Sequence, residues 1–401
     1  MEDGQKSKKT DRLNIFSGGR SPYKPPLAVS AILLLSLGLG IGGGFIGEKL
    51  AAHSRSSTIA AKQQYVSDEG ALIGSIAKTV GPSVVSIDVQ SRSNATDVFG
   101  FSQPTSQQSA GTGFIISSSG LIVTNRHVVP IGTTSVSVTL ADGTKFNNVQ
   151  VVGRTAGSSS QDVAFLKIAN LHGKNLTPVT LGDSSKMNVG DRVIAIGNAL
   201  GQFQNTVTSG IISGFGRDVT AGDQSGLTAS ENLTDLFQTD AAINEGNSGG
   251  PLVNINGEVI GVNTAIAASA QNIGFAQPIN DLKGLIKGVL ASGKLQVPYL
   301  GVRYVSLTND IASEFNLSTK RGAYIVTSGS DPAVLSGSPA ATAGLQEKDI
   351  ITKVNSISID QNTSLTAAIS RFKVGDKVTL TVVRGSKTLT LHATLATEPT
   401  Q

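Results

Sequence analysis

Ser248 lies in the run Gly-Asn-Ser-Gly-Gly-Pro at positions 246–251, whose composition suits chemistry better than packing. Glycines around the serine let the backbone curl until amide N–H groups point inward. Inward-pointing amides are what the developing oxyanion of an acyl transfer requires. The run therefore predicts a serine nucleophile beside its own oxyanion hole.

A serine nucleophile needs a general base within hydrogen-bond reach, and the chain has four histidines to supply one. His127 follows the strand-like run at 121–124 at a turn, where its imidazole would face a cleft. His53 lies in a polar stretch near the N-terminus, His172 in a polar loop and His392 in the last apolar run of the chain. We therefore expect His127 to be the base.

Asp162 is our candidate for the acid that orients the base. It opens the apolar run 163–166, which would carry it at the edge of a buried strand, whereas Asp142 belongs to an Asp-Gly turn. Spacing alone does not prove the triad. The same hexapeptide fits the nucleophile elbow of α/β-hydrolases, but there the serine precedes the acid and histidine and leads into a helix. Pro251 and an apolar run follow here, so we set that alternative aside.

Short apolar runs separated by turn residues would position these side chains, a pattern typical of an all-β barrel or sandwich. The runs are 84–89, 113–116, 121–124, 136–140, 163–168, 192–196, 207–212, 252–255 and 259–263. Asp-Gly at 142–143 and Asn-Gly at 256–257 predict hairpin turns. A long polar loop is expected at 91–110, and helices at 278–290 and 364–372.

Composition excludes several classes of site. The chain of 401 residues has no cysteine, so disulfides, thiolate nucleophiles and cysteine metal sites are ruled out. Its four histidines are scattered, and we expect no metal and no cofactor. A net charge of +4 without a clustered basic face does not favour nucleic acid. The abundance of glycine, with 46 residues, suits strands and turns.

The N-terminus combines basic residues with an uncharged segment. The basic residues are Lys6, Lys8, Lys9, Arg12, Arg20 and Lys24. Residues 27–47 carry no charge and match the roughly 20 residues that a helix needs to cross a bilayer. The positive-inside rule then exports everything that follows. A cleaved signal peptide is the alternative, although the polar leader of about 25 residues is long for one.

Composition shifts divide the chain into five parts. We expect a cytoplasmic basic tail at 1–26, a transmembrane helix at 27–47, a tether at 48–70, a catalytic domain at 71–292 and a C-terminal module at 295–396. The C-terminal module has its own apolar set, which is sufficient for a small core.

Three blocks of the chain together resemble the catalytic blocks of the HtrA (Deg) serine proteases. They are Thr-Asn-Arg-His-Val-Val at 124–129, Asp-Val-Ala-Phe-Leu at 162–166 and the hexapeptide at 246–251. Residues 239–244 and 274–276 also match the surroundings of that family's active site. The resemblance covers about residues 70–395.

The resemblance implies an all-β protein with a trypsin-like double β-barrel followed by an α+β PDZ domain. Two perpendicular six-stranded barrels would enclose the triad, with His127 and Asp162 from the first and Ser248 from the second. The amides of Gly246 and Ser248 would bind the oxyanion, with Asn247 in the turn between them. Ala242, six residues before the nucleophile, would form the base of the S1 pocket and select small or medium aliphatic side chains.

The C-terminal module resembles an HtrA-type PDZ domain. Its carboxylate-binding loop would consist of Tyr299, Leu300, Gly301 and Val302, and residues 338–351 resemble the most recognisable internal stretch of that domain. In this fold a peptide C-terminus is captured by backbone N–H groups and adds a strand, here beside 302–305. The helix around 365–372 would form a wall of the side-chain pocket.

One anchor, one protease and one PDZ domain resemble the DegS-like, membrane-tethered arrangement. The resemblance implies an ATP-independent endopeptidase that acts outside the cytoplasm on misfolded or signalling proteins, in a periplasm or at a cell surface. It also implies a homotrimer, C-terminal peptides as PDZ ligands, and a sensor loop near 216–234 whose rearrangement completes the oxyanion hole. A peptide-binding or chaperone-like quality-control factor, for which proteolysis is secondary, stays open as the alternative.

Overall fold

The computed structural model describes residues 31–32, 35–40, 44, 68–96, 102–199, 203–221, 231–244, 246–264, 273–327, 329 and 331–399. The chain forms two compact units, residues 1–69 and 70–401. The expected basic tail, and most of the expected membrane span and tether, lie outside the described residues. The described residues between 31 and 44 are helical. Within the described part of the chain, no helix has the length and apolar character needed to cross a bilayer.

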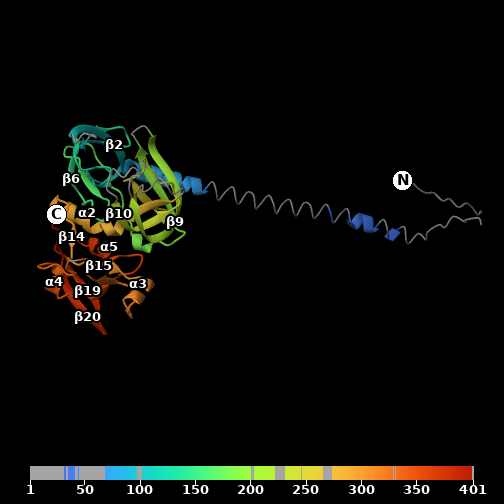
Figure 1. The fold of residues 1–401 in the computed structure, drawn as a ribbon. Helices are drawn as coiled ribbons and strands as arrows, with labels where there is room; N and C mark the ends of the chain where they lie inside the picture. Colours follow the sequence, from blue (N-terminus) through green and yellow to red (C-terminus); the bar gives the residue numbers. More distant parts are fainter. Residues whose placement is uncertain are drawn as a thin grey trace, which may run out of the picture. The chain divides into compact units, whose positions relative to one another are not determined.

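The first half of the protease region is a curled sheet, in which Figure 1 labels β2 and β6. The sheet has seven strands in the order β5-β4-β1-β2-β3-β7-β6. Its strands are β1 (Val84–Thr96), β2 (Ser102–Ser117), β3 (Leu121–Thr124), β4 (Thr133–Thr139), β5 (Lys145–Phe146), β6 (Gln150–Arg154) and β7 (Ala164–Lys167), preceded by the 3-10 turn η1 (Gly81–Ser83). The predicted Asp-Gly turn connects β4 to β5, with Gly143 at a φ of 82°.

The described parts of the polar segment 91–110, which was expected to be a loop, are strands instead: 91–96 belong to β1 and 102–110 to β2, and residues 97–101 lie outside the described residues. β1 and β2 pair without interruption from Val84 opposite Phe114 to Thr96 opposite Ser102. Antiparallel strands pair through backbone hydrogen bonds, which do not depend on the side chains. A strand whose side chains are not buried therefore need not show alternating apolar residues in its sequence.

The second half closes into a six-stranded barrel in the order β10-β13-β12-β11-β8-β9. Its strands are β8 (Arg192–Ala199), β9 (Phe203–Ala221), β10 (Glu231–Thr239), β11 (Pro251–Asn254), β12 (Val259–Thr264) and β13 (Gly274–Pro278), with the 3-10 turn η2 (Ser184–Lys186) before them. Much of the segment 216–234, expected to be a sensor loop, belongs to β9 and β10, which pair as far as Ala221 opposite Glu231. Residues 222–230 lie outside the described part.

A shared apolar core joins the two halves of the protease region. Phe114 and Phe165 from the sheet, and Ile194 and Val262 from the barrel, belong to one cluster and are fully buried. Burial of each such side chain contributes roughly 1.5–3 kcal/mol. This core holds together the strand ends that carry the polar residues of the site.

A helical segment closes this core. It starts as the 3-10 turn η3 (Ile279–Leu282) and continues as α2 (Lys283–Ser292), close to the expected 278–290. Gly293 ends it in the left-handed conformation with a φ of 71°, as is usual for a helix C-cap.

The C-terminal module has a five-stranded path β15-β16-β17-β19-β20, with β18 beside β17 and a separate pair β14-β21. Its elements are β14 (Pro298–Tyr299), β15 (Tyr304–Ser306), α3 (Asn309–Glu314), β16 (Ala323–Ile325), α4 (Pro339–Ala343), β17 (Ile350–Val354), β18 (Ile357–Ser358), α5 (Leu365–Ser370), β19 (Lys377–Arg384), β20 (Lys387–Thr394) and β21 (Ala396–Thr397). The module encloses a second core, which includes Ile351, Leu365 and Leu380. Ser364 caps α5 by accepting a hydrogen bond from the Ala367 amide.

Candidate active site

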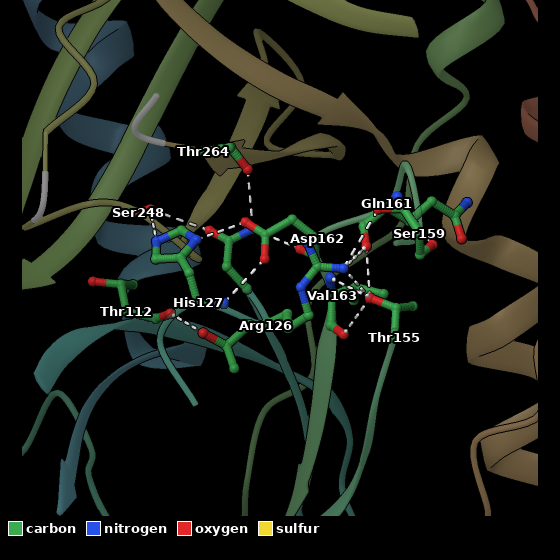
Figure 2. Close-up of polar contacts among 12 residues, drawn as sticks. Thr112, Arg126, His127, Thr155, Ser159, Gln161, Asp162, Val163, Ser248 and Thr264 are labelled. Carbon is green, nitrogen blue, oxygen red and sulfur yellow. Dashed lines mark hydrogen bonds and ion pairs between the residues drawn. The ribbon is translucent and has the colours of Figure 1, made fainter. Parts of the chain in front are cut away.

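Ser248, His127 and Asp162 lie in one hydrogen-bonded row (Figure 2). Oγ of Ser248 is 2.9 Å from Nε2 of His127, and Nδ1 of the same ring is 2.6 Å from Oδ2 of Asp162. Antiparallel β3 and β7 pair Thr124 with Ala164, which brings the turn that carries His127 beside Asp162, two residues before β7. The three residues chosen from the sequence are therefore brought together.

The Asp162 carboxylate is buried, but hydrogen bonds and nearby positive charge stabilise its ionised form. Burial by itself raises the pKa of this carboxyl, yet the charge of His127 and two hydrogen bonds from that residue, together with the charge of Arg126, keep its pKa below the usual value. One of those bonds comes from the His127 backbone N–H to Oδ1, at 3.0 Å. Asp162 is thus held ionised, and it fixes both the ring and the backbone of the base.

Arg126 fixes the loop that carries the acid, and sequence reasoning did not single it out. Its Nη1 donates to the carbonyl oxygens of Gln161, at 3.0 Å, and of Ala156. Figure 2 shows the guanidinium turned away from the imidazole toward Thr155 and Gln161. The two residues before His127 therefore have different roles, because Arg126 anchors a neighbouring loop whereas Asn125 faces Ser248, as described below.

The glycines of the nucleophile turn are required by close backbone contacts. A Cβ at Gly249 would collide with the carbonyl oxygen of Thr112 and with Oγ1 of Thr124, and its φ is 83°. A Cβ at Gly250 would collide with the carbonyl oxygen of Ile196. The turn packs directly on strands of both halves, which only residues without side chains allow.

Thr112 of β2 fastens that turn from the opposite half. Its backbone N–H donates to the carbonyl oxygen of Ser248 at 3.0 Å, and its Oγ1 donates to that of Gly246 at 2.9 Å. The same Oγ1 accepts from the Asn198 amide of β8 at 2.9 Å. Thr112 lies 136 positions before the nucleophile, so no local pattern pointed to it.

The nucleophile turn has its own internal hydrogen bonds, and these differ from the expected oxyanion hole. The Ser248 amide, expected to face an oxyanion, donates to the carbonyl oxygen of Asn244 at 3.0 Å. The Asn247 side chain, which is 2% exposed, accepts from the Asn244 amide and donates to the carbonyl oxygen of Ala242, each at 2.9 Å. In this conformation one of the two expected oxyanion donors is engaged within the turn.

Comparisons with known proteins agree with this geometry. Residues 111–262 match the trypsin-like peptidase domain, and residues 298–395 match the PDZ domain. The chain is 37% identical to the serine protease Do-like HtrA of Lactococcus lactis subsp. cremoris over 390 residues, which cover 89% of this chain and 92% of that protein. It belongs to the HtrA family of serine endopeptidases.

Two further relatives support the assignment to the HtrA family. The periplasmic serine endoprotease DegP of Salmonella typhimurium is 36% identical over 411 residues, which cover 93% of this chain and 80% of that protein. The solved structure of the HtrA-type protease AlgW with a decapeptide aligns with a TM-score of 0.56 and 31% identity, and covers 82% of this chain and 99% of AlgW. The family resemblance found in the sequence is confirmed.

Ala242, the residue expected at the base of the HtrA S1 pocket, is exposed beside the nucleophile turn. Its carbonyl oxygen accepts from Oγ1 of Thr208 and from Nδ2 of Asn247, each at 2.9 Å. The side chain at this position is a single methyl group, which cannot form an ion pair with a basic substrate side chain.

The expected peptide loop of the HtrA PDZ domain begins at β14 and precedes β15. Leu300 is buried, and Gly301 has a φ of 87° with Ser338 packed where a Cβ would lie. The Arg303 N–H donates to the carbonyl oxygen of Ala333, and the carbonyl oxygen of Gly301 accepts from the Leu335 N–H, so both bonds lie on the same side of the loop. Because N–H and C=O groups alternate in direction along a strand, those of Val302 point to the other edge, where an added strand would pair.

No cluster of His, Asp and Glu side chains suited to a metal ion occurs among the described residues.

Proposed function

We propose that Ser248 attacks a peptide carbonyl while His127 removes its proton, and that Asp162 steadies the resulting imidazolium. The observation that carries this proposal is the unbroken row of contacts, 2.9 Å from Oγ to Nε2 and 2.6 Å from Nδ1 to Oδ2. His127 then returns the proton to the leaving amine, and water hydrolyses the acyl-enzyme by the same route. The low pKa of the acid suits this role, because an ionised Asp162 stabilises a cationic ring.

We infer that this conformation is a resting state. An oxyanion needs N–H donors that are free to point at it, and the Ser248 amide is engaged with Asn244 instead. Rotation of the turn would release that donor. Loss of one such donor costs about 10²–10³ in rate, so the release would act as a switch.

We propose that the PDZ domain biases this switch. Two polar contacts join it to the protease region: Ser364 donates to the Asp235 carboxylate through N–H, at 2.8 Å, and through its hydroxyl, and Arg371 pairs with Asp281 at 2.8 Å. A peptide bound along the free edge of the PDZ domain would shift the conformation of the nucleophile turn if the peptide binds more tightly to one arrangement of the two domains than to another. The AlgW structure that resembles this chain holds a decapeptide, which supports peptides as ligands.

For the S1 pocket we propose a preference for small or medium aliphatic residues such as Val, Ala or Ile. The methyl group of Ala242 supports it, because a basic P1 side chain needs a carboxylate at the base of the pocket. Cleavage of a peptide library will test this directly. A preference for Arg at P1 would refute it.

We propose that the enzyme acts outside the cytoplasm, tethered through residues 27–47, on misfolded or signalling proteins and as a homotrimer. The uncharged 21-residue segment behind basic residues supports the tether. The relative DegP is a periplasmic endoprotease, which supports a location outside the cytoplasm. Fractionation of cells that express the full chain, with carbonate extraction of membranes, distinguishes an anchor from a cleaved signal peptide.

The experiment that tests the catalytic proposal is degradation of casein by the purified chain and by Ser248→Ala, with and without C-terminal peptides. We expect turnover to fall by roughly 10⁶ in the variant. Retained proteolysis would refute the assignment of the nucleophile. If the variant still suppresses aggregation of an unfolded client as well as the wild type does, the chaperone-like alternative gains support.

A further inference from the structure

Among the described residues, two acceptors lie within hydrogen-bond reach of the Ser248 hydroxyl, and the mechanism above uses one of them. Oγ lies 2.9 Å from Nε2 of His127 and 3.2 Å from Oδ1 of Asn125. A hydroxyl carries a single hydrogen, so it can donate fully to only one of them at a time. The amide of Asn125 therefore competes with the base for the proton of the nucleophile.

The orientation of the Asn125 amide is set by its other end. Its Nδ2 donates to the carbonyl oxygen of Asp162 at 2.9 Å and to Oγ1 of Thr264 at 3.0 Å. A flipped amide would place two oxygens against each other at Asp162, which is unfavourable in a fully buried site. Oδ1 consequently faces Ser248 as a fixed acceptor.

The two protonation states of the base use these acceptors differently. When His127 is neutral with its proton on Nδ1, the hydroxyl of Ser248 donates to Nε2. When the ring is protonated, Nε2–H becomes a donor to Oγ, and the hydroxyl has to donate elsewhere. Asn125 is the acceptor placed to receive it, so the protonated state is fully hydrogen-bonded as well.

We propose that Asn125 is a positioning residue for the nucleophile, which holds the Ser248 hydroxyl beside His127 whenever the ring is protonated. Asn125 thereby stabilises the enzyme form in which His127 is protonated. It also influences the pH at which His127 loses that proton and can act as the base. This inference rests on the proposed catalytic roles of Ser248 and His127, but it adds a third group that acts on the same hydroxyl.

Within the described part of the chain, the charged groups cited near His127 come from two segments. Asp162 contacts the ring from the segment before β7, and Arg126 precedes it in the turn after β3. Among the described residues of the nucleophile turn, 246–250, none is titratable. Asn125 is uncharged, so its influence on the base has to pass through the hydrogen bond to Ser248.

A double-mutant cycle tests this route. His127 is followed by ¹⁵N-histidine NMR in the full chain as wild type, Asn125→Ala, Ser248→Ala and the double variant. With the Ser248 hydroxyl present, we expect Asn125→Ala to lower the midpoint of the His127 titration by about half to one pH unit, the value of one neutral hydrogen bond. In the Ser248→Ala background, the same substitution is expected to leave the midpoint unchanged.

Two outcomes would overturn the proposal. An equal shift in both backgrounds would mean that Asn125 acts through Asp162, and no shift with the hydroxyl present would mean that it does not act on the base. The catalytic assignment itself is tested separately, by the loss of proteolysis expected for Ser248→Ala. Failure of that assignment is therefore distinguishable from failure of this inference.

Kinetics supply a second readout and a matched control. For Asn125→Ala we expect the acid limb of kcat/KM to move to lower pH by the same amount, with KM unchanged and kcat above the limb reduced by less than about tenfold. Thr264→Val removes an acceptor of Nδ2 but keeps Oδ1 in place, and its acid limb should stay at the wild-type position. A shift as large in Thr264→Val as in Asn125→Ala would contradict the assigned role of Oδ1.

Discussion

Asp162 and Asp281 are both buried carboxylates with a basic side chain within hydrogen-bond distance, yet their pKa values move in opposite directions. The pKa of Asp162, in the triad, is held below its usual value, whereas burial raises the pKa of Asp281, at the contact with the PDZ domain, to about 7. Each carboxylate has an ion-pair partner within 2.8 Å. A nearby cation is therefore not sufficient to keep a buried acid ionised.

The difference lies in the other groups around each carboxylate. Asp162 receives a second hydrogen bond from the His127 backbone and feels the charge of Arg126, whereas Asp281 receives only the bond from Arg371 Nε among the described groups. Asp281 also lies in the field of the Asp235 carboxylate, which adds to the rise of its pKa. Asp162, the proposed catalytic acid, therefore stays ionised near neutral pH, whereas the protonation of Asp281 at the domain contact changes in that range.

Neutralising the catalytic acid is expected to have the largest effect. Asp162→Asn keeps the shape of the side chain but favours the wrong tautomer of His127, and kcat should fall by about 10⁴. Peptide hydrolysis by the purified variant measures this. A loss below tenfold would show that Asp162 does not orient the base.

Removal of the cation at the domain contact comes next. Arg371→Ala leaves the Asp281 carboxylate buried without its partner, which costs roughly 3–5 kcal/mol of docking or folding free energy when the carboxylate stays ionised. Thermal unfolding at pH 8, together with hydrogen exchange over 364–371, measures the loss. Lys373→Ala, in an exposed pair with Asp376, is the control and should change stability by less than about 0.5 kcal/mol.

The two acids should respond to pH with opposite sign. The pKa of Asp281 is raised in the docked state above the unperturbed value of about 3.9, so the docked state binds more protons between these limits. Its contribution is complete below about pH 4 and is lost as the pH rises to about 7. The contribution of Asp162, whose pKa is lowered, is instead present above about pH 4 and lost on acidification.

Hydrogen exchange of α5 between pH 5 and pH 8 measures the first of these effects. We expect protection to weaken as the pH rises, because ionised Asp281 is poorly accommodated at the contact. Protection that strengthens with pH would mean that the ion pair with Arg371 outweighs burial.

Asp281→Asn is expected to have the smallest effect on catalysis. It therefore tests most directly whether Asp281 and Asp162 act independently. The substitution removes the titrating group but leaves the triad untouched, so basal kcat should stay within about threefold of wild type. The pH dependence of α5 protection should become weaker at the same time, and what remains comes from Asp235, whose pKa is also raised by burial and whose carboxylate accepts from Ser364 at the start of α5. A loss of kcat comparable to that of Asp162→Asn would show that the two acids are not independent.

The grouping of His127, Asp162 and Ser248 in one hydrogen-bonded row was predictable, because a catalytic triad can use only a few residue types. Only four histidines had to be compared, and the order of His127, Asp162 and Ser248 removed the competing hydrolase fold. Hairpin turns were predictable for a local reason, since Asn-Gly and Asp-Gly tolerate positive φ. The helix before the PDZ domain was visible in its apolar spacing.

What could not be predicted depends on contacts between distant segments. Asn125 meets Ser248 across 123 positions, and Gln161 donates to the Asp281 carbonyl oxygen across 120. No periodicity encodes such pairs. The strands at 91–110 were missed because strand pairing there leaves no alternation of apolar residues, and the bond from the Ser248 amide to Asn244 was missed because composition does not specify a peptide orientation.

Thr112 makes the nucleophile turn dependent on a strand from the other half of the protease region. Its backbone and hydroxyl bind the carbonyl oxygens of Ser248 and Gly246, so the turn gains its shape only when both halves have assembled. A nascent chain that has completed the first sheet contains His127 and Asp162 but not Ser248, and a fragment that begins after Thr112 contains Ser248 without this support. We therefore expect proteolytic activity to appear only after both halves of the domain have been synthesised and have folded together.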